Sequence, residues 1–140
     1  MDVLKERLIK TLNLTKDFFN HISEEDLKLK ISDVPSNTIG EQAYCIVGAR
    51  ESYLEALKIG EWAGFKCSLL ESHNKPLIVS KLEETQSDIE RFLQESSSEI
   101  NMNLVMDLLE HEVQHHGQLI RYAYANKFAF PKSWNVRYTV

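Results

Sequence analysis

The sequence predicts an all-α fold, a four-helix bundle with one long interhelical connection. Four segments carry apolar residues at the three- and four-residue spacing of an amphipathic helix, and turn or capping residues separate them. No segment alternates apolar and polar residues as a half-buried strand would. The connection 60–75 is far longer than the others, which predicts that not all consecutive helices form simple hairpins. A chain of 140 residues is long enough to bury a core, so residues 1–140 are expected to form a single domain.

Each predicted helix has its own boundaries. The first spans about 3–22 and precedes a short helical turn capped by residues 23–26, and the third runs from Pro76 to the break at 95–98. The fourth spans 102–126. The tail 130–134 holds two aromatic residues around a proline, and we expect it to fold back across one end of the bundle because these rings would otherwise be exposed.

The second helix is expected to start at a capping box and to be unusually slim. Thr38 and Glu41 have the spacing in which each side chain bonds the other residue's backbone N–H, and the helix then runs to about residue 57 or 59. Gly40 and Gly48 leave room for a neighbouring segment or a bound group to approach closely.

Composition excludes several classes of protein. The hydrophobic fraction of 43% and charged fraction of 26% are those of an ordinary globular protein, and the net charge of −5 comes with no basic patch. Nucleic-acid binding is therefore not expected. No apolar run has the length of a membrane span, and the N-terminus lacks the apolar block of a secretory signal, so we expect a cytoplasmic protein. In that compartment Cys45 and Cys67 would be free thiols unless one binds metal.

The most informative feature is a histidine pair in the fourth helix. His111 and His115 are four residues apart and therefore leave the same helix face. That face is the predicted inner stripe, formed by Leu104, Leu108, His111, His115, Leu119 and Tyr122. Two inward imidazoles could bind one cation, and imidazole suits zinc, nickel, copper and iron. Alternatively, each ring could be a core histidine that is hydrogen-bonded to a neighbour. His116 is expected on the flank of the helix, outside the metal site.

Three stretches of the chain resemble the DinB-like (DinB/YfiT) superfamily. His111-x-x-x-His115 followed by Gly117-Gln118 is similar to the family's fourth-helix signature, in which both histidines bind metal and an arginine precedes Gly-Gln. Residues 38–50 resemble the family's second helix, which supplies a third histidine ligand, and residues 130–134 resemble its C-terminal segment. The resemblance implies a metal-binding four-helix bundle and a homodimer. It also implies kinship with metal-dependent thiol S-transferases and hydrolases.

Two residues depart from that pattern, and both lie at the implied site. His116 stands where the family has arginine, and Cys45 stands where the third histidine is expected. Cys45 could be a thiolate ligand that completes a His/His/Cys site, or a small core residue on a helix flank. Glu41 is a fallback carboxylate ligand, although a capping role explains it too. Gln118 could orient a ligand or substrate, or form an interhelical hydrogen bond.

Two functional hypotheses follow. The first is an enzyme that depends on a divalent transition metal (zinc, nickel or iron) and acts on a small molecule, such as a low-molecular-weight thiol. No general base stands out, and a Cys45–histidine nucleophilic pair is disfavoured. The second is a non-catalytic bundle with a degenerate site that binds a small ligand or serves dimerisation, with no metal bound because Cys45 replaces the histidine.

A homodimer is expected from the aromatic residues as well as from the resemblance. The chain carries more aromatic residues than the ends of a bundle usually leave uncovered, namely Trp62, Phe65, Phe128 and Phe130.

Overall fold

The computed structural model describes residues 2–96 and 99–140, and the described part of the chain is helical without strands. This confirms the predicted all-α class. Its elements are α1 (Val3–His21), the short 3-10 helix η1 (Glu25–Lys28), α2 (Ile39–Ile59), α3 (Lys75–Glu95), α4 (Met102–Asn126) and α5 (Lys132–Tyr138). None of the described helices has the length and apolar character needed to cross a membrane.

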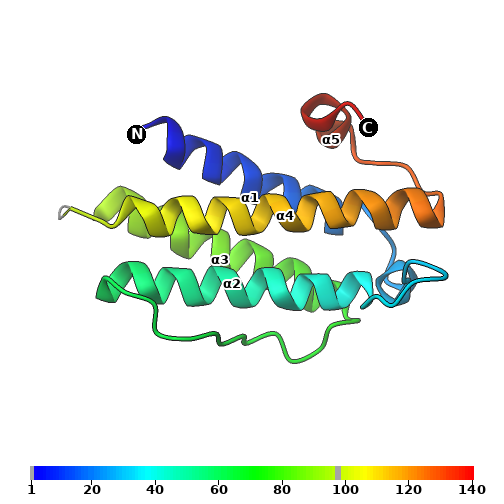
Figure 1. Ribbon diagram of the computed structural model, residues 1–140, viewed down its shortest axis with the longest axis horizontal. Coiled ribbons are helices and arrows are strands. Elements are labelled where there is room, and N and C mark those ends of the chain that lie inside the picture. The colour runs from blue at the N-terminus through cyan, green and yellow to red at the C-terminus, as the bar shows by residue number, and fades with distance from the viewer. Residues whose placement is uncertain (1, 97–98) are drawn as a thin grey trace.

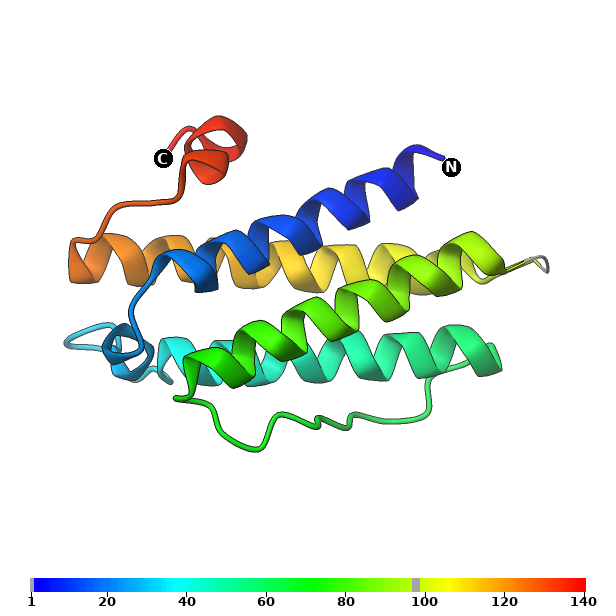
Figure 2. The same ribbon diagram turned by 180° about the vertical axis from the view of Figure 1, so that it is seen from behind.

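The four long helices lie side by side, and their directions explain the long connection (Figure 1). Helices α1 and α4 run one way and α2 and α3 the other, so the chain must cross the whole length of the bundle between α2 and α3 (Figure 2). Each long helix packs against two others, in the ring α1–α4–α2–α3. The residues between α2 and α3 form this crossover, which lies along the outside of α2.

Capping side chains set the helix starts that the sequence predicts. Thr38 and Glu41 form the predicted capping box, and Asn74 accepts a hydrogen bond from the Leu77 N–H at the start of α3. Gly60 ends α2 in the left-handed conformation, with φ of 94°, where a side chain would be strained.

The slimness of α2 accommodates the crossover rather than a neighbouring helix. A Cβ atom placed on Gly48 would lie 2.2 Å from the ring of Phe65, and one on Gly40 would lie 1.8 Å from the carbonyl oxygen of Ser72. Both distances are far below van der Waals contact. The two glycines therefore let the crossover lie directly on the helix.

The core consists of two apolar clusters separated by a polar belt. One cluster is centred on Phe18, Ile46 and Tyr122, and the other on Leu12, Leu57 and Leu108. Between them the same helices contribute buried polar residues, namely Thr15, Thr85, Gln86, Arg50, Glu112, His115 and His116. A belt of buried polar groups across a helical core requires that its members satisfy one another.

The C-terminal tail folds back onto the bundle as predicted, but it packs along α1 and not across one end of the bundle. Trp134 of α5 is completely buried in the cluster that contains Phe18, and its indole N–H donates to the Leu14 carbonyl oxygen at 2.6 Å. Ser133 donates to Asp17 at 2.7 Å. These contacts place α5 against α1 (Figure 1).

Candidate functional site

His111 and His115 face the interior from adjacent turns of α4, as the stripe predicts. The exposed fraction of His115 is 8%, and His111 is half-buried. Their ring centroids are 4.6 Å apart. The helix therefore brings two imidazoles together at one place in the bundle.

Gln42 of α2 fixes the orientation of His115. The Gln42 amide nitrogen donates to Asn37 Oδ1 at 2.8 Å, which turns its Oε1 toward His115 Nδ1 at 2.5 Å. Because that oxygen only accepts, Nδ1 of His115 carries the proton and the lone pair of Nε2 is left free. A hydrogen bond of this kind to the far nitrogen is what usually orients a metal-binding histidine.

His111 leaves a buried ring nitrogen without a partner. Its Nδ1 is shielded from solvent and makes no hydrogen bond within the described part of the chain. Such a nitrogen costs folding free energy unless something binds it.

Both rings are neutral at pH 7. Burial, together with the neighbouring His111, lowers the pKa of His115 to about 4. Burial also lowers the pKa of His111, although the Glu112 carboxylate opposes that shift. A neutral imidazole is the form that binds metal, so protons do not compete for these nitrogens near neutral pH.

Beside this pair lies a completely buried ion pair that the sequence analysis missed. Both Arg50 of α2 and Glu112 of α4 are 0% exposed, and Arg50 Nη2 lies 2.5 Å from Glu112 Oε2. Nε of Arg50 donates to Glu112 Oε1 at 3.2 Å, and the other guanidinium donors bond Leu82 O, Thr85 Oγ1 and Leu12 O. Burial alone would raise the pKa of Glu112, but the charge and hydrogen bonds of Arg50 outweigh it and hold that pKa below its usual value.

His116 extends this ion pair toward α5, and its expected place on the helix flank was wrong. The ring is 0% exposed. Thr15 donates to Glu112 Oε2 at 2.5 Å, so its oxygen accepts from Nε2 of His116 at 2.7 Å. Nδ1 of His116 then accepts from the Tyr138 hydroxyl at 2.6 Å. Both nitrogens are committed, so His116 has no lone pair for a metal.

The other predicted site residues make no hydrogen bond to His111 or His115 within the described part of the chain. Cys45 is half-buried on α2, and burial, together with the Glu41 carboxylate, raises the pKa of its thiol. Glu41 is exposed and accepts from the Thr38 N–H, which is its capping role. Gln118 is exposed, and Gln42 instead makes the contact to His115 that would orient a ligand.

The described side chains contain no group of three or more His, Cys, Asp or Glu residues placed to hold a metal ion. The structure thus joins His111 and His115 but does not bring Cys45 into a three-residue set with them.

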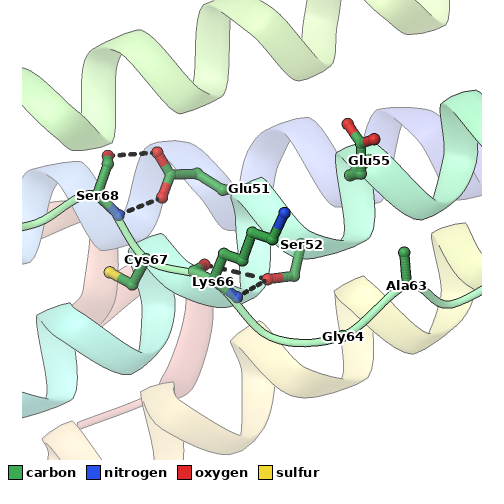
Figure 3. Close-up of a pocket in the computed structure, with 8 residues that line it drawn as sticks. All are labelled: Glu51, Ser52, Glu55, Ala63, Gly64, Lys66, Cys67 and Ser68. Atoms are coloured by element: carbon green, nitrogen blue, oxygen red, sulfur yellow. Dashed lines mark hydrogen bonds between the residues drawn. The ribbon is translucent and has the colours of Figure 1, made fainter.

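A cavity of about 450 Å³ lies elsewhere, between α2 and the crossover (Figure 3). Several of its polar groups already bond one another. Glu51 accepts from both the N–H and the hydroxyl of Ser68, and Ser52 exchanges two hydrogen bonds with the backbone of Lys66. These bonds fasten the crossover to α2.

Comparisons with known proteins add no family assignment. No protein-family model matches the chain, and no curated protein matches it significantly.

Proposed function

We propose that this protein is a divalent-metal-binding helical bundle of the DinB-like type, with His111 and His115 as two of its ligands. The observation that carries the proposal is the buried Nδ1 of His111, which has no hydrogen-bond partner among the described residues and belongs to a ring beside that of His115. The bond from Gln42 supports it, because it leaves Nε2 of His115 free. Zinc, nickel and iron all accept such nitrogen ligands.

Cys45 is the proposed third ligand. Its donor chemistry fits, because a thiolate with two imidazoles is a suitable set for zinc. The raised pKa of the thiol means that binding must displace its proton. Metal affinity should therefore increase with pH above neutrality, where the histidines no longer titrate.

The proposed reaction class is transfer to a low-molecular-weight thiol, or hydrolysis. A divalent ion with an open position would supply the nucleophile by lowering the pKa of a bound thiol or water. Within the chain, Gln42 holds His115 in one tautomer and the Arg50–Glu112 pair keeps α2 and α4 in register. The bond from Gln42 limits rotation of the His115 ring.

A second candidate is a non-catalytic bundle that dimerises or binds a small ligand. It is favoured by the lack of a three-residue metal-binding group among the described side chains. Trp62 and Phe65 on the crossover are each 49% exposed and could pack against a second copy. Phe128 and Phe130 are half-buried against the core and contribute less to such a surface.

Cobalt and zinc titrations of the untagged, metal-free protein test the proposal. We expect one ion per chain in the unmodified protein and loss of binding in His111→Ala and His115→Ala. His73→Ala is the matched control, because His73 is half-buried but bonds Thr38. Stoichiometric binding that survives both α4 substitutions would refute the proposed site.

Variants of the two cysteines test the third ligand. Cys45→Ser should remove the thiolate-to-cobalt charge-transfer absorption and weaken binding sharply, and Cys45→His should restore binding. Cys67→Ser is the control, since Cys67 is also half-buried but donates to the Tyr44 carbonyl. Unchanged binding by Cys45→Ser would exclude this residue as a ligand and favour the second candidate.

Sedimentation analysis at micromolar concentration tests the proposed homodimer. We expect a dimer that Trp62→Ser/Phe65→Ser dissociates. A 16.2 kDa monomer in the unmodified protein would contradict it.

A further inference from the structure

A second cavity lies between α1 and α5. Its volume is about 380 Å³, which is within the range of small-molecule sites. One wall is a stripe of α1 at spacings of three, four and three residues: Arg7, Lys10, Leu14 and Asp17. The opposite wall is the face of α5 that carries Ser133, Val136 and Arg137.

The charges around this cavity are strongly unbalanced. Arg7, Lys10 and Arg137 line it, and none of them forms an ion pair within the described part of the chain. Asp17 is the one carboxylate in the lining, and it accepts a hydrogen bond from Ser133 at the other end of the stripe. All three cations are exposed, so solvent screens part of their mutual repulsion, and a bound anion would relieve the rest.

The cavity also has an apolar side. Leu14 of α1 and Val136 of α5 both line it, and Leu14 is buried whereas Val136 is 79% exposed. A ligand that fits both features carries an anionic group at one end and a short apolar group at the other. Burial of that apolar group would cover Val136.

The walls of the cavity are held in place before any ligand binds. The buried indole of Trp134 bonds the Leu14 carbonyl, and Tyr138 bonds His116 in the core. The Arg137 guanidinium lies 4.7 Å from the centre of the Tyr138 ring, a cation–π distance. Preorganisation of this kind reduces the entropy that binding costs.

We propose that the cavity between α1 and α5 binds a small organic phosphate, whose anionic group contacts Arg7, Lys10 and Arg137 and whose apolar substituent packs on Leu14 and Val136. A phosphate monoester fits better than a monocarboxylate, because its second charge and three free oxygens can engage three cations together. The site is independent of the histidine pair and of any metal.

Phenyl phosphate is the probe that tests this proposal. Titration followed by amide NMR should give saturable shifts at Leu14, Ser133 and Arg137, with affinity that falls as salt is added. Benzyl alcohol and phenyltrimethylammonium match its apolar part and should not bind there. Vesicles of phosphatidylcholine with and without phosphatidic acid distinguish a lipid phosphate from a free one, and we expect binding of the free ester alone.

Charge-matched variants separate a specific site from general attraction. Arg7→Gln/Lys10→Gln/Arg137→Gln should weaken phenyl phosphate binding by at least about tenfold. Lys28→Gln/Lys58→Gln/Arg121→Gln removes three exposed cations outside the cavity. This variant should change the affinity for phenyl phosphate less than about twofold. Circular dichroism checks that both variants are folded. The proposal is overturned if the two triple variants lose affinity equally, if the shifts do not saturate, or if the neutral or cationic probe binds equally well.

Discussion

Replacing Glu112 with glutamine would keep the shape of a buried side chain while removing its charge. The carboxylate accepts from Nε and Nη2 of Arg50 and from the hydroxyl of Thr15, and both members of the ion pair are 0% exposed. A glutamine has one oxygen with which to accept, and its NH₂ group would face the guanidinium donors. The Arg50 charge would then be buried with no counter-charge.

The expected loss is large because of that unpaired charge. Removing one partner of a buried ion pair typically costs about 3–5 kcal/mol of unfolding free energy. The carbonyl oxygens of Leu12 and Leu82 would still bond Arg50, which places our estimate for Glu112→Gln at about 3 kcal/mol. With a urea slope of about 2 kcal/mol per molar, the unfolding midpoint would fall by about 1.5 M.

Urea unfolding at pH 7, followed by circular dichroism, measures this loss. Glu110→Gln is the matched control, because it makes the same charge change at an exposed position of α4 and should cost less than about 0.5 kcal/mol. The double substitution Arg50→Met/Glu112→Leu removes both charges and should be more stable than Glu112→Gln alone. The reasoning is refuted if Glu112→Gln and Glu110→Gln have the same midpoint.

Three further predictions follow from other contacts. Burial lowers the pKa of His116 to about 4 in the fold, so below pH 6.5 the unfolded chain binds a proton at this residue that the folded chain does not. This histidine alone should cost the metal-free protein up to about 3 kcal/mol of unfolding free energy between pH 6.5 and 4, in addition to the loss from His115, whose pKa is lowered alike. Denaturant titrations across that range should therefore show a shallower loss in His116→Gln than in the unmodified protein. Gly48→Ala should destabilise the protein by about 1–3 kcal/mol, because the new Cβ would collide with Phe65. Gly117→Ala has open space around it and should stabilise α4 by up to about 1 kcal/mol. Equal changes in the thermal midpoint of the two variants would contradict the close approach of Phe65 to α2. Gln42→Leu should weaken metal binding about tenfold or more at unchanged fold, because His115 loses the bond that fixes its tautomer, and a titration indistinguishable from that of the unmodified protein would rule out this orienting role.

The helices could be predicted because each one carries its own local signals. The capping box at Thr38, the proline at the start of α3 and the apolar stripes each depend on residues within one or two turns. The long connection was also visible in the sequence. Its length indicated that not all consecutive helices form simple hairpins. Its position along α2 could not be predicted, because it follows from two glycines and from a ring that lies 17 residues beyond Gly48 in the chain.

The candidate site was harder to predict because its contacts depend on the register between helices. The stripe correctly turned His111 and His115 inward, but α4 packs against both α1 and α2 and therefore buries a face wider than one stripe. Glu112 and His116 lie on that wider face. The sequence feature that could have indicated a buried ion pair was Arg50, a charged residue that follows valine, glycine and alanine in α2. Nothing in the neighbouring sequence shows that its partner is Glu112, which lies 62 residues further along the chain.

The arrangement of the four long helices also has a consequence for how fast the chain folds. In the ring of four helices, α1 packs against α3 and α4, and α2 also packs against α3 and α4. Helices α1 and α2 are consecutive in the chain but lie diagonally opposite each other, and so do α3 and α4. Few tertiary contacts can therefore form by closing a short hairpin. Folding rates fall as the sequence separation between contacting residues increases. This chain should fold more slowly than a bundle of equal length whose helices simply alternate in direction. The slow step would be the docking of α1 onto α4, because these are the first and the last of the long helices in the chain.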